Sequence, residues 1–207
     1  MLGTPTRDRQ AERRKATRQE ILDAAWAVAR DKGLASLTLK EVAERVGMQA
    51  PSLYSHFASK HAIYDAMFGQ AWSEYDELDA ANDAAEYGGP RAQVLAKALQ
   101  FFDFAADDLA RYQLMNQRTI PGFEPSPESY APSLRVIQRN LERLATLGVR
   151  ERGDVEILFS VIGGLVDQQL ANDPGGDSRR QLIKRAVEMW ADGVGLPPQP
   201  RKRKART

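Results

Sequence analysis

Cysteine is absent from this sequence of 207 residues, and histidine occurs only as His56 and His61. Disulfide bonds and thiolate chemistry are therefore excluded, and a transition-metal site would need carboxylates alone, which suits zinc poorly. No apolar run is long enough to cross a bilayer, and the charged N-terminal stretch does not resemble a secretory signal. We therefore expect a soluble, cytoplasmic protein that carries neither a metal ion nor another cofactor.

Strand-like patterning is also missing. No segment alternates apolar and polar residues for long, and Val, Ile and Thr rarely cluster, whereas apolar residues recur with helical spacing almost everywhere. The sequence therefore predicts an all-α fold. Capping boxes at Thr17, Thr38 and Ser178 predict three helix starts. After Gly88-Gly89-Pro90 we expect helices at about 90–108, 109–118, 131–147, 153–171 and 178–193, with a proline-stiffened loop between the second and third of these.

The net charge of +1 hides an uneven distribution along the chain. Residues 1–60 carry 11 Lys or Arg against 7 Asp or Glu, residues 61–200 carry 13 against 21, and residues 201–207 add five basic side chains. Two basic ends around an acidic body favour a polyanion-binding function for the ends. Ordinary surface charge with a solvated tail is the alternative.

Residues 38–57 have the spacing of two short helices joined by a tight turn, as in a helix-turn-helix motif. The first helix ends at Gly47, and its apolar face is formed by Leu39, Val42, Ala43 and Val46. The second is predicted to pack inward through Ala50, Leu53 and Phe57. Its other side presents small or flat polar groups suited to base edges and phosphates: Gln49, Ser52, Tyr54, Ser55 and His56. A plain αα-hairpin has the same spacing, so the pattern alone leaves both interpretations open.

The stretch from Ser36 to Lys60 closely resembles the DNA-binding domain of the TetR family of bacterial repressors. The most specific part is the run Leu53-Tyr54-Ser55-His56-Phe57-Ala58-Ser59-Lys60. The upstream residues Ile21-Leu22-Asp23-Ala24-Ala25 and Gly33 are similar to the family's first helix and its turn. The resemblance implies a helix-turn-helix domain at 17–62 and a helical ligand-binding and dimerisation domain at 63–194. The polar, basic composition of residues 1–16 predicts a flexible arm before them, and the proline-rich, then basic composition of residues 195–207 predicts a disordered tail after them.

The resemblance also implies roles for individual residues. Thr38 and Lys40 fall where the second helix touches the DNA backbone or a base edge, Tyr54 and His56 fall where phosphates are usually contacted, and Lys60 falls at a phosphate-binding helix N-terminus. The predicted double-stranded DNA site is Thr38, Lys40, Gln49, Ala50, Pro51, Ser52, Tyr54, Ser55, His56 and Lys60.

The predicted recognition helix differs in one respect from many helices that recognise DNA sequences. It contains no arginine, so bidentate contacts to guanine are missing, and its only amide side chain is Gln49. We expect sequence preference to depend on Gln49, Ser52, threonine-methyl or apolar contacts, and DNA shape. The basic arm is expected to add phosphate or minor-groove contacts through Arg7, Arg9, Arg13, Arg14, Lys15 and Arg18, with a solvated tail as the alternative.

The C-terminal part offers candidates for a ligand pocket and for a dimer interface. Aromatic and soft side chains in the middle helices suit an apolar cavity, although ordinary core is the alternative; the predicted ligand residues are Phe101, Phe104, Tyr112, Met115, Arg118 and Phe123. The last two helices carry too many apolar residues for a single stripe, which favours a homodimer over a larger intrachain core. The predicted interface is Ile157, Val161, Gly164, Leu165, Gln168, Ala186, Met189 and Trp190.

Taken with the resemblance, these features predict a repressor that binds a pseudo-palindromic operator as a homodimer and is released by a small, largely apolar effector of unknown identity. A constitutive or nonspecific DNA-binding protein is the alternative, and the basic tail supports it. An enzyme is not expected, because the sequence shows no nucleophile elbow, glycine-rich phosphate loop or Cys/His pair. No membrane partner is expected.

Overall fold

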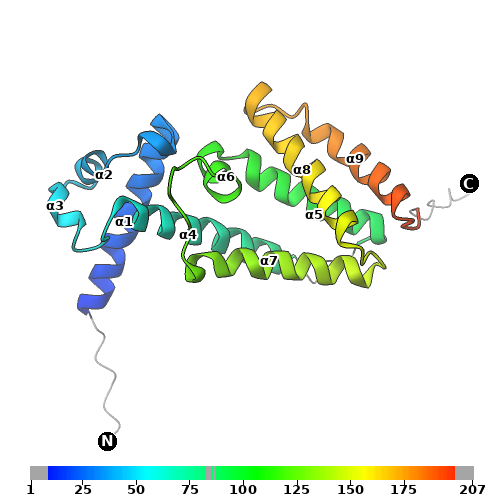
Figure 1. The fold of residues 1–207 in the computed structure, drawn as a ribbon, viewed down its shortest axis with the longest axis horizontal. Coiled ribbons are helices and arrows are strands. Elements are labelled where there is room, and N and C mark those ends of the chain that lie inside the picture. Colours follow the sequence, from blue (N-terminus) through cyan, green and yellow to red (C-terminus); the bar gives the residue numbers. More distant parts are fainter. Residues whose placement is uncertain (1–8, 83–84, 86, 199–207) are drawn as a thin grey trace, which may run out of the picture. The chain divides into compact units, whose positions relative to one another are not determined.

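The computed structural model describes residues 9–82, 85 and 87–198 of the chain. Within these residues all regular structure is helical, with no strand, which confirms the predicted fold class (Figure 1). The helices are α1 (Arg9–Lys32), the 3-10 helix η1 (Leu34–Ser36), α2 (Leu39–Val46), α3 (Ala50–Leu53), α4 (Lys60–Ala81), α5 (Pro90–Ala106), α6 (Leu109–Asn116), α7 (Pro127–Thr146), α8 (Arg152–Asn172) and α9 (Arg180–Gly193). Arg7 and the basic residues after position 200 lie outside the described residues.

The chain divides into two compact units. The first comprises residues 1–71 and 113–130, and the second comprises residues 72–112 and 131–207. The boundary predicted between residues 62 and 63 falls inside α4. Helices α4, α6 and α7 each contribute residues to both units, so the chain passes between the units inside helices rather than through flexible linkers.

The N-terminal helix begins eight residues earlier than predicted, at Arg9 instead of Thr17. The capping box at Thr17 and a flexible arm over residues 9–16 are therefore wrong. The segment consists of Ala, Gln, Glu, Lys and Arg, which have high helix propensity and continue a helix without an apolar face of their own.

The first unit has a small apolar core. Helix α1 packs against α2 and η1, and α2 packs against α3. The core includes Ile21, Ala25, Val28, Leu34, Leu37, Val42, Leu53, Phe57, Ile63 and Met67. Tyr64 is fully buried among them, and its hydroxyl donates a hydrogen bond of 2.5 Å to the carbonyl of Leu34, which ties α4 to η1.

The first unit also holds the start of α7, which begins at Pro127 rather than at the predicted residue 131. Asp65 of α4 accepts hydrogen bonds from the Ser126 amide (2.6 Å) and hydroxyl (2.9 Å) and from the Ser129 hydroxyl (2.9 Å). The Ser126 hydroxyl in turn accepts from the Ser129 amide. The Ser126 hydroxyl is therefore the cap of α7, Pro127 occupies the first helical position, and Asp65 holds this cap from α4. The cap is a local signal that the sequence analysis missed.

In the second unit, α5, α8 and α9 pack against one another. Their shared core includes Val94, Phe102, Leu158, Ile162, Val166, Ile183, Val187 and Trp190. Helix α9 begins at Arg180, so the capping box predicted at Ser178 is wrong. The amides of Ser178 and Arg179 instead donate to the side chains of Asp173 (3.0 Å) and Gln169 (2.9 Å), which replace the expected serine cap.

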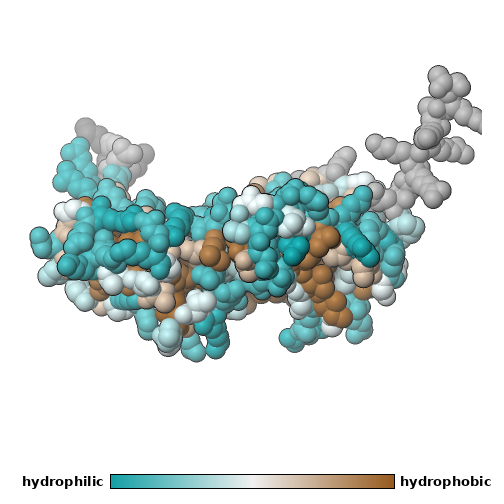
Figure 2. Space-filling view, turned by 90° about the horizontal axis from the view of Figure 1, so that it is seen from above, coloured by the Kyte–Doolittle hydropathy of each residue, from teal (hydrophilic) through white to brown (hydrophobic). Residues whose placement is uncertain are grey.

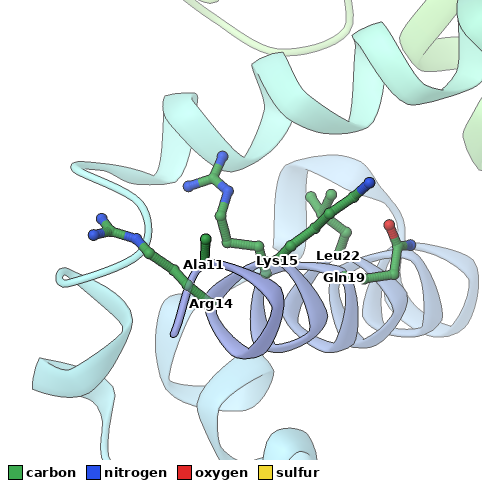
Figure 3. A pocket seen from close by; sticks show the side chains of 6 residues that line it. Ala11, Arg14, Lys15, Gln19 and Leu22 are labelled. Carbon is green, nitrogen blue, oxygen red and sulfur yellow. The ribbon is translucent and has the colours of Figure 1, made fainter. Parts of the chain in front are cut away.

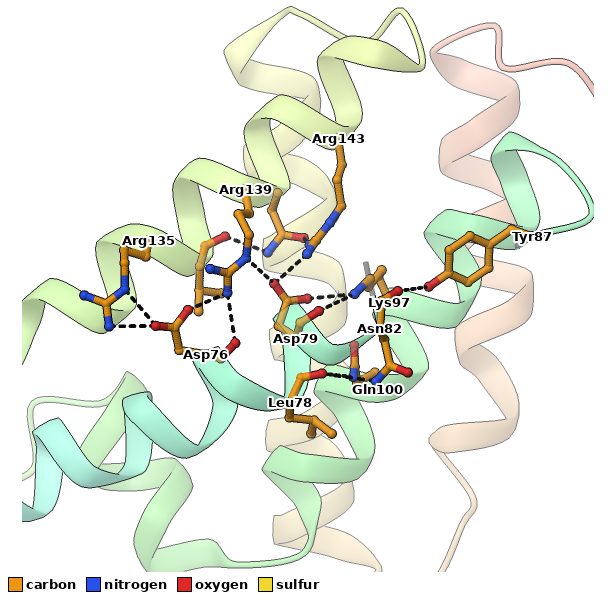
Figure 4. A network of polar contacts seen from close by, with 12 residues as sticks. Asp76, Leu78, Asp79, Asn82, Tyr87, Lys97, Gln100, Arg135, Arg139 and Arg143 are labelled. Carbon is orange, nitrogen blue, oxygen red and sulfur yellow. Dashed lines mark hydrogen bonds and ion pairs between the residues drawn. The ribbon is translucent and has the colours of Figure 1, made fainter. Parts of the chain in front are cut away.

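A network of charged side chains also holds the second unit together (Figure 4). Asp79 of α4 is fully buried and pairs with Lys97 (3.1 Å), Arg139 (3.2 Å) and Arg143 (2.7 Å). The neighbouring carboxylate of Asp76 pairs with Arg139 and with Arg135 (2.7 Å). Burial alone would raise the pKa of Asp79, but hydrogen bonds from Arg143 and Lys97 outweigh this effect and lower it. The network therefore fixes α4 to α5 and α7 by charge.

Candidate nucleic-acid interface

The turn between α2 and α3 is built by local sequence signals. Thr38 precedes α2, and its hydroxyl accepts a hydrogen bond from the Glu41 amide, as the capping pattern predicts. Gly47 ends α2 in the left-handed conformation with φ of 74°, which favours glycine. Pro51 lies in the first turn of α3, where its missing N–H is tolerated.

The helix after this turn is shorter than predicted. Its α-helical part covers only Ala50–Leu53, and residues 54–57 continue as turns whose amides donate to the carbonyls of residues 51–53. We refer to residues 49–57 as the recognition segment. Its two sides differ as predicted, because Leu53 and Phe57 are buried and Ala50 is half-buried, whereas Gln49, Pro51, Ser52, Tyr54 and Ser55 are exposed.

The exposed side of the recognition segment is polar but carries no net charge. Tyr54 is the most prominent large side chain on it, with an exposed fraction of 57%. The Ser55 hydroxyl donates to the Ser52 carbonyl (2.7 Å), which fixes its direction. His56 is half-buried rather than fully outward. These flat and small groups fit close approach to a duplex.

Two cations flank the recognition segment. Lys40 on α2 is the more accessible one, with 81% of its side chain exposed and a 3.8 Å ion pair to Glu44. Lys60 is half-buried, its ammonium lies 5.3 Å from the centre of the Tyr64 ring, and it donates to the Ala35 carbonyl at 3.4 Å. Lys60 stands at the start of α4, where Ser59 accepts the Ala62 amide. Of these two lysines, Lys40 is therefore the one that is freer to meet a ligand in solvent.

The sequence did not reveal the contacts between α1 and the recognition segment. Arg18 lies with its guanidinium 4.0 Å from the centre of the Phe57 ring and donates to the His56 carbonyl. Arg14 donates to the Ser55 carbonyl at 3.1 Å. Both arginines line a shallow groove along α1 with Lys15, which points away from Arg14 (Figure 3). These contacts join residues about 40 positions apart, so no local spacing could have signalled them.

The predicted ligand residues are divided between the two units. In the second unit, Phe101 and Phe104 both pack on Tyr75, with ring centres 5.5 and 5.0 Å apart, whereas Tyr112 is buried in the core. The others belong to the first unit, where Met115 is buried, Arg118 is exposed, and Phe123 packs on Tyr64 with ring centres 5.8 Å apart.

Phe104 also lines a groove of about 690 Å³ in the second unit, a volume within the range of small-molecule sites. The Arg111 guanidinium covers the Phe104 ring at 3.9 Å. The walls are partly apolar and partly polar, and they comprise Leu78, Asn82, Ala85, Tyr87, Ala96, Leu99, Gln100, Asp103, Phe104, Asp107 and Arg111.

Most of the predicted interface residues lie on the outside of α8 and α9. Ile157 and Met189 are 55% and 64% exposed, and Val161, Gly164 and Gln168 are also exposed. Leu165 and Ala186 are half-buried, and Leu182, which was not predicted, is exposed beside them. Figure 2 shows a hydrophobic patch on the otherwise hydrophilic surface in the region of α8 and α9.

Trp190 is the exception among the predicted interface residues. It is only 8% exposed, it belongs to the core of the second unit, and its indole N–H donates to the Asp154 carbonyl at 2.8 Å. Its place at an interface is therefore corrected. A large aromatic ring on an amphipathic helix fits either the core or an interface, and the sequence alone could not separate the two.

The described part of the chain lacks two features. Among those residues, no group of His, Asp or Glu side chains has the arrangement needed to hold a metal ion. In the same residues, no helix combines the length and the hydrophobicity needed to cross a membrane.

A helix-turn-helix with an exposed polar recognition segment, in a chain that also contains a larger helical unit, defines an all-helical transcription regulator of the helix-turn-helix class. The family model for "Bacterial regulatory proteins, tetR family" matches residues 21–67. The tetracycline repressor protein class A from transposon 1721 of Escherichia coli is 40% identical over 164 residues, covering 76% of this chain and 69% of the relative. The chain belongs to the TetR family of DNA-binding transcription regulators.

Solved structures agree with this assignment at the level of the fold. A regulatory protein of the tetR family from Rhodococcus RHA1 superposes with a TM-score of 0.63 at 21% identity, covering 87% of this chain and 98% of that structure. The regulator FadR from Bacillus subtilis, solved in complex with stearoyl-CoA, gives a TM-score of 0.61 at 17% identity over 84% and 98% of the two chains.

Proposed function

We propose that the protein is a cytoplasmic, homodimeric repressor that binds a pseudo-palindromic operator and is released by a small, largely apolar effector. The observation that carries the DNA-binding part is the two-sided recognition segment. Leu53 and Phe57 anchor it in the core, while Gln49, Ser52 and Tyr54 remain accessible. In a dimer, two such segments enter successive major grooves about 34–36 Å apart.

The exposed faces of α8 and α9 support the dimer. Ile157, Val161, Gly164 and Gln168 recur at helical spacing on one side of α8, and Met189 projects from α9. Leaving several large apolar side chains in water is unfavourable, and a two-fold copy of the same pair of helices would bury them in a four-helix bundle. Trp190 is not part of the proposed interface.

The groove at Phe104 supports a small effector. Its walls combine apolar side chains such as Leu78, Leu99 and Phe104 with the polar groups of Gln100 and Arg111, and a few polar groups among apolar ones are usual where a largely apolar ligand is oriented. Related proteins are named for tetracycline or were solved with stearoyl-CoA. An effector acts only if it binds the released conformation more tightly than the DNA-bound one.

The DNA-binding part is tested by selecting bound sequences from random duplex DNA and footprinting the result. We expect protection of a pseudo-palindrome whose half-sites lie one helical turn, or a multiple of it, apart. Binding that is indifferent to sequence at raised salt would favour the constitutive or nonspecific DNA-binding alternative.

Sedimentation equilibrium tests the dimer, with Met189→Asp as the disrupting variant and Lys184→Asp, on an exposed position of the same helix, as the control. Tetracycline and stearoyl-CoA serve as effector probes, and a positive result is release of the selected DNA together with a raised unfolding temperature. A wild-type protein that sediments as a monomer while bound to the full palindrome contradicts the proposed assembly.

A further inference from the structure

The recognition segment is short and depends on neighbours for its position. Only Ala50–Leu53 is α-helical, and the exposed residues Tyr54 and Ser55 lie in the turns that follow. A helix of this length contains few internal hydrogen bonds, so it is not stable by itself. Carbonyl groups at the end of a helix also need donors from elsewhere. What holds residues 54–57 therefore decides how their side chains meet DNA.

Two arginines of α1 supply those donors. The Arg18 guanidinium donates to the His56 carbonyl and stacks over the Phe57 ring, while Arg14, one helical turn earlier, donates to the Ser55 carbonyl. A cation at a helix C-terminus is favourable because it meets the negative end of the helix dipole. The planar guanidinium can donate in its plane and stack on an aromatic ring with its face, which an ammonium cannot do.

We propose that Arg18 is a positioning residue for DNA recognition, assisted by Arg14, and that it does not bind a phosphate itself. Its guanidinium is half-buried and is occupied by the backbone and the ring of the recognition segment. This role is opposite to the one expected for a basic arm, whose arginines would bind phosphates directly. Because α1 continues back to Arg9, the helical extension becomes part of the DNA-reading unit. The DNA-binding test of this inference rests on the proposed operator binding.

Three variants of the full chain test the proposal: Arg18→Ala, Arg18→Lys and, as the control, Lys15→Ala. Lys15 is an exposed cation in the same groove of α1. Affinity for the selected duplex is measured over a series of salt concentrations. Amide hydrogen exchange of residues 53–57 is measured on the free protein, without DNA.

We expect Arg18→Ala to weaken binding by about tenfold or more, the effect of losing one charge-assisted hydrogen bond. The slope of log affinity against log salt should stay unchanged, because no phosphate contact is removed. Amides 53–57 should exchange faster, since the turns lose an external donor. Arg18→Lys should fail to restore affinity, and Lys15→Ala should leave amide exchange at its wild-type rate.

The opposite pattern overturns the proposal: a salt slope that becomes shallower by about one, restoration by lysine, and unchanged exchange at 53–57. If Arg18→Ala does not fold, the milder Arg14→Ala variant tests the proposal through the same two measurements, the salt dependence of DNA affinity and the amide exchange of residues 53–57. Should wild type select no DNA sequence, the repressor proposal fails, and the exchange measurement still decides whether Arg18 holds the recognition segment.

Discussion

The two units use their charged side chains differently. In the described part of the first unit, no charged side chain is buried, and its arginines and lysines lie at or near the surface. The second unit buries Asp76, Asp79, Arg91 and Lys97, among others. Most charged side chains of the first unit therefore remain at its surface, with Arg14 and Arg18 engaged by the recognition segment, whereas several charges of the second unit hold its helices together. The charged network of the second unit holds two carboxylates against four cations, so the acidic balance of residues 61–200 lies in the side chains outside it.

The largest expected effect comes from breaking the buried network. Asp79→Asn leaves Lys97, Arg139 and Arg143 around a neutral group, and loss of one partner of a buried ion pair costs roughly 3–5 kcal/mol. Urea unfolding at neutral pH measures this change.

The exposed pair of Arg180 and Asp103 provides the control, since both side chains are about half exposed. Asp103→Asn should cost at most about 1 kcal/mol. Equal losses of unfolding free energy for the two substitutions would mean that burial does not make the ion pairs of Asp79 more important for stability than an exposed pair.

Because of the same network, the free energy of unfolding should depend on pH in the acidic range. The pKa of Asp79 is lowered from its ordinary value of 3.8, so the folded state prefers the charged carboxylate. Its contribution is fully present above that value and is lost as the pH falls through the lower, folded-state value. The difference in unfolding free energy between wild type and Asp79→Asn should therefore shrink below about pH 4. Urea titrations at several pH values measure it, and a constant difference would contradict the assignment.

Two adjacent glycines of α8, Gly163 and Gly164, lie on different sides of the helix, and only Gly164 lies on the side of the proposed interface. A Cβ at either Gly163 or Gly164 would meet nothing within 4 Å in the protomer. Gly164 is exposed on the same side as Val161, whereas the Gly163 carbonyl accepts from Tyr112 (3.4 Å).

Gly164→Leu should therefore weaken dimerisation by about 1–3 kcal/mol through overpacking, while helix propensity improves. Sedimentation equilibrium measures the dimer, and Gly163→Ala serves as the matched control. A dimer that tolerates Gly164→Leu would place the interface elsewhere.

Within the first unit, Gln49 and Lys40 should differ in the kind of contact they make. Gln49→Ala is expected to reduce discrimination at particular base pairs by roughly 1–3 kcal/mol, because an amide reads base edges. Lys40→Ala should weaken binding to all sequences similarly and make the salt dependence shallower by about one phosphate contact. Competition between selected and altered duplexes separates the two, and identical behaviour would refute this division of roles.

The parts that the sequence predicted correctly are those with local causes. Thr38, Gly47 and the spacing of Leu53 and Phe57 define the helix-turn-helix within 20 residues. Some of what the sequence missed depends on partners outside the local pattern: Arg14 contacts Ser55, and Gln169 replaces a serine cap at Arg179. The position of Trp190 is of the same kind, since only packing decides between core and interface. Other errors are misread local signals, namely the helix propensity of residues 9–16 and the cap of α7 at Ser126.

The smallest expected effect compares two caps that look alike in sequence. Thr38 accepts the Glu41 amide at the start of α2, so Thr38→Ala should cost about 1 kcal/mol. Ser178 occupies the same position in its motif, but the Arg179 amide donates to Gln169, which is fully buried.

Ser178→Ala should therefore cost less than Thr38→Ala, and Gln169→Leu should cost more than either, because it leaves the Arg179 amide without its acceptor. Urea unfolding of the three variants under one set of conditions gives the order. If Ser178→Ala lowers the free energy of unfolding as much as Thr38→Ala does, the Ser178 hydroxyl caps α9 after all. The local capping motif, and not the buried side chain of Gln169, would then fix the start of α9.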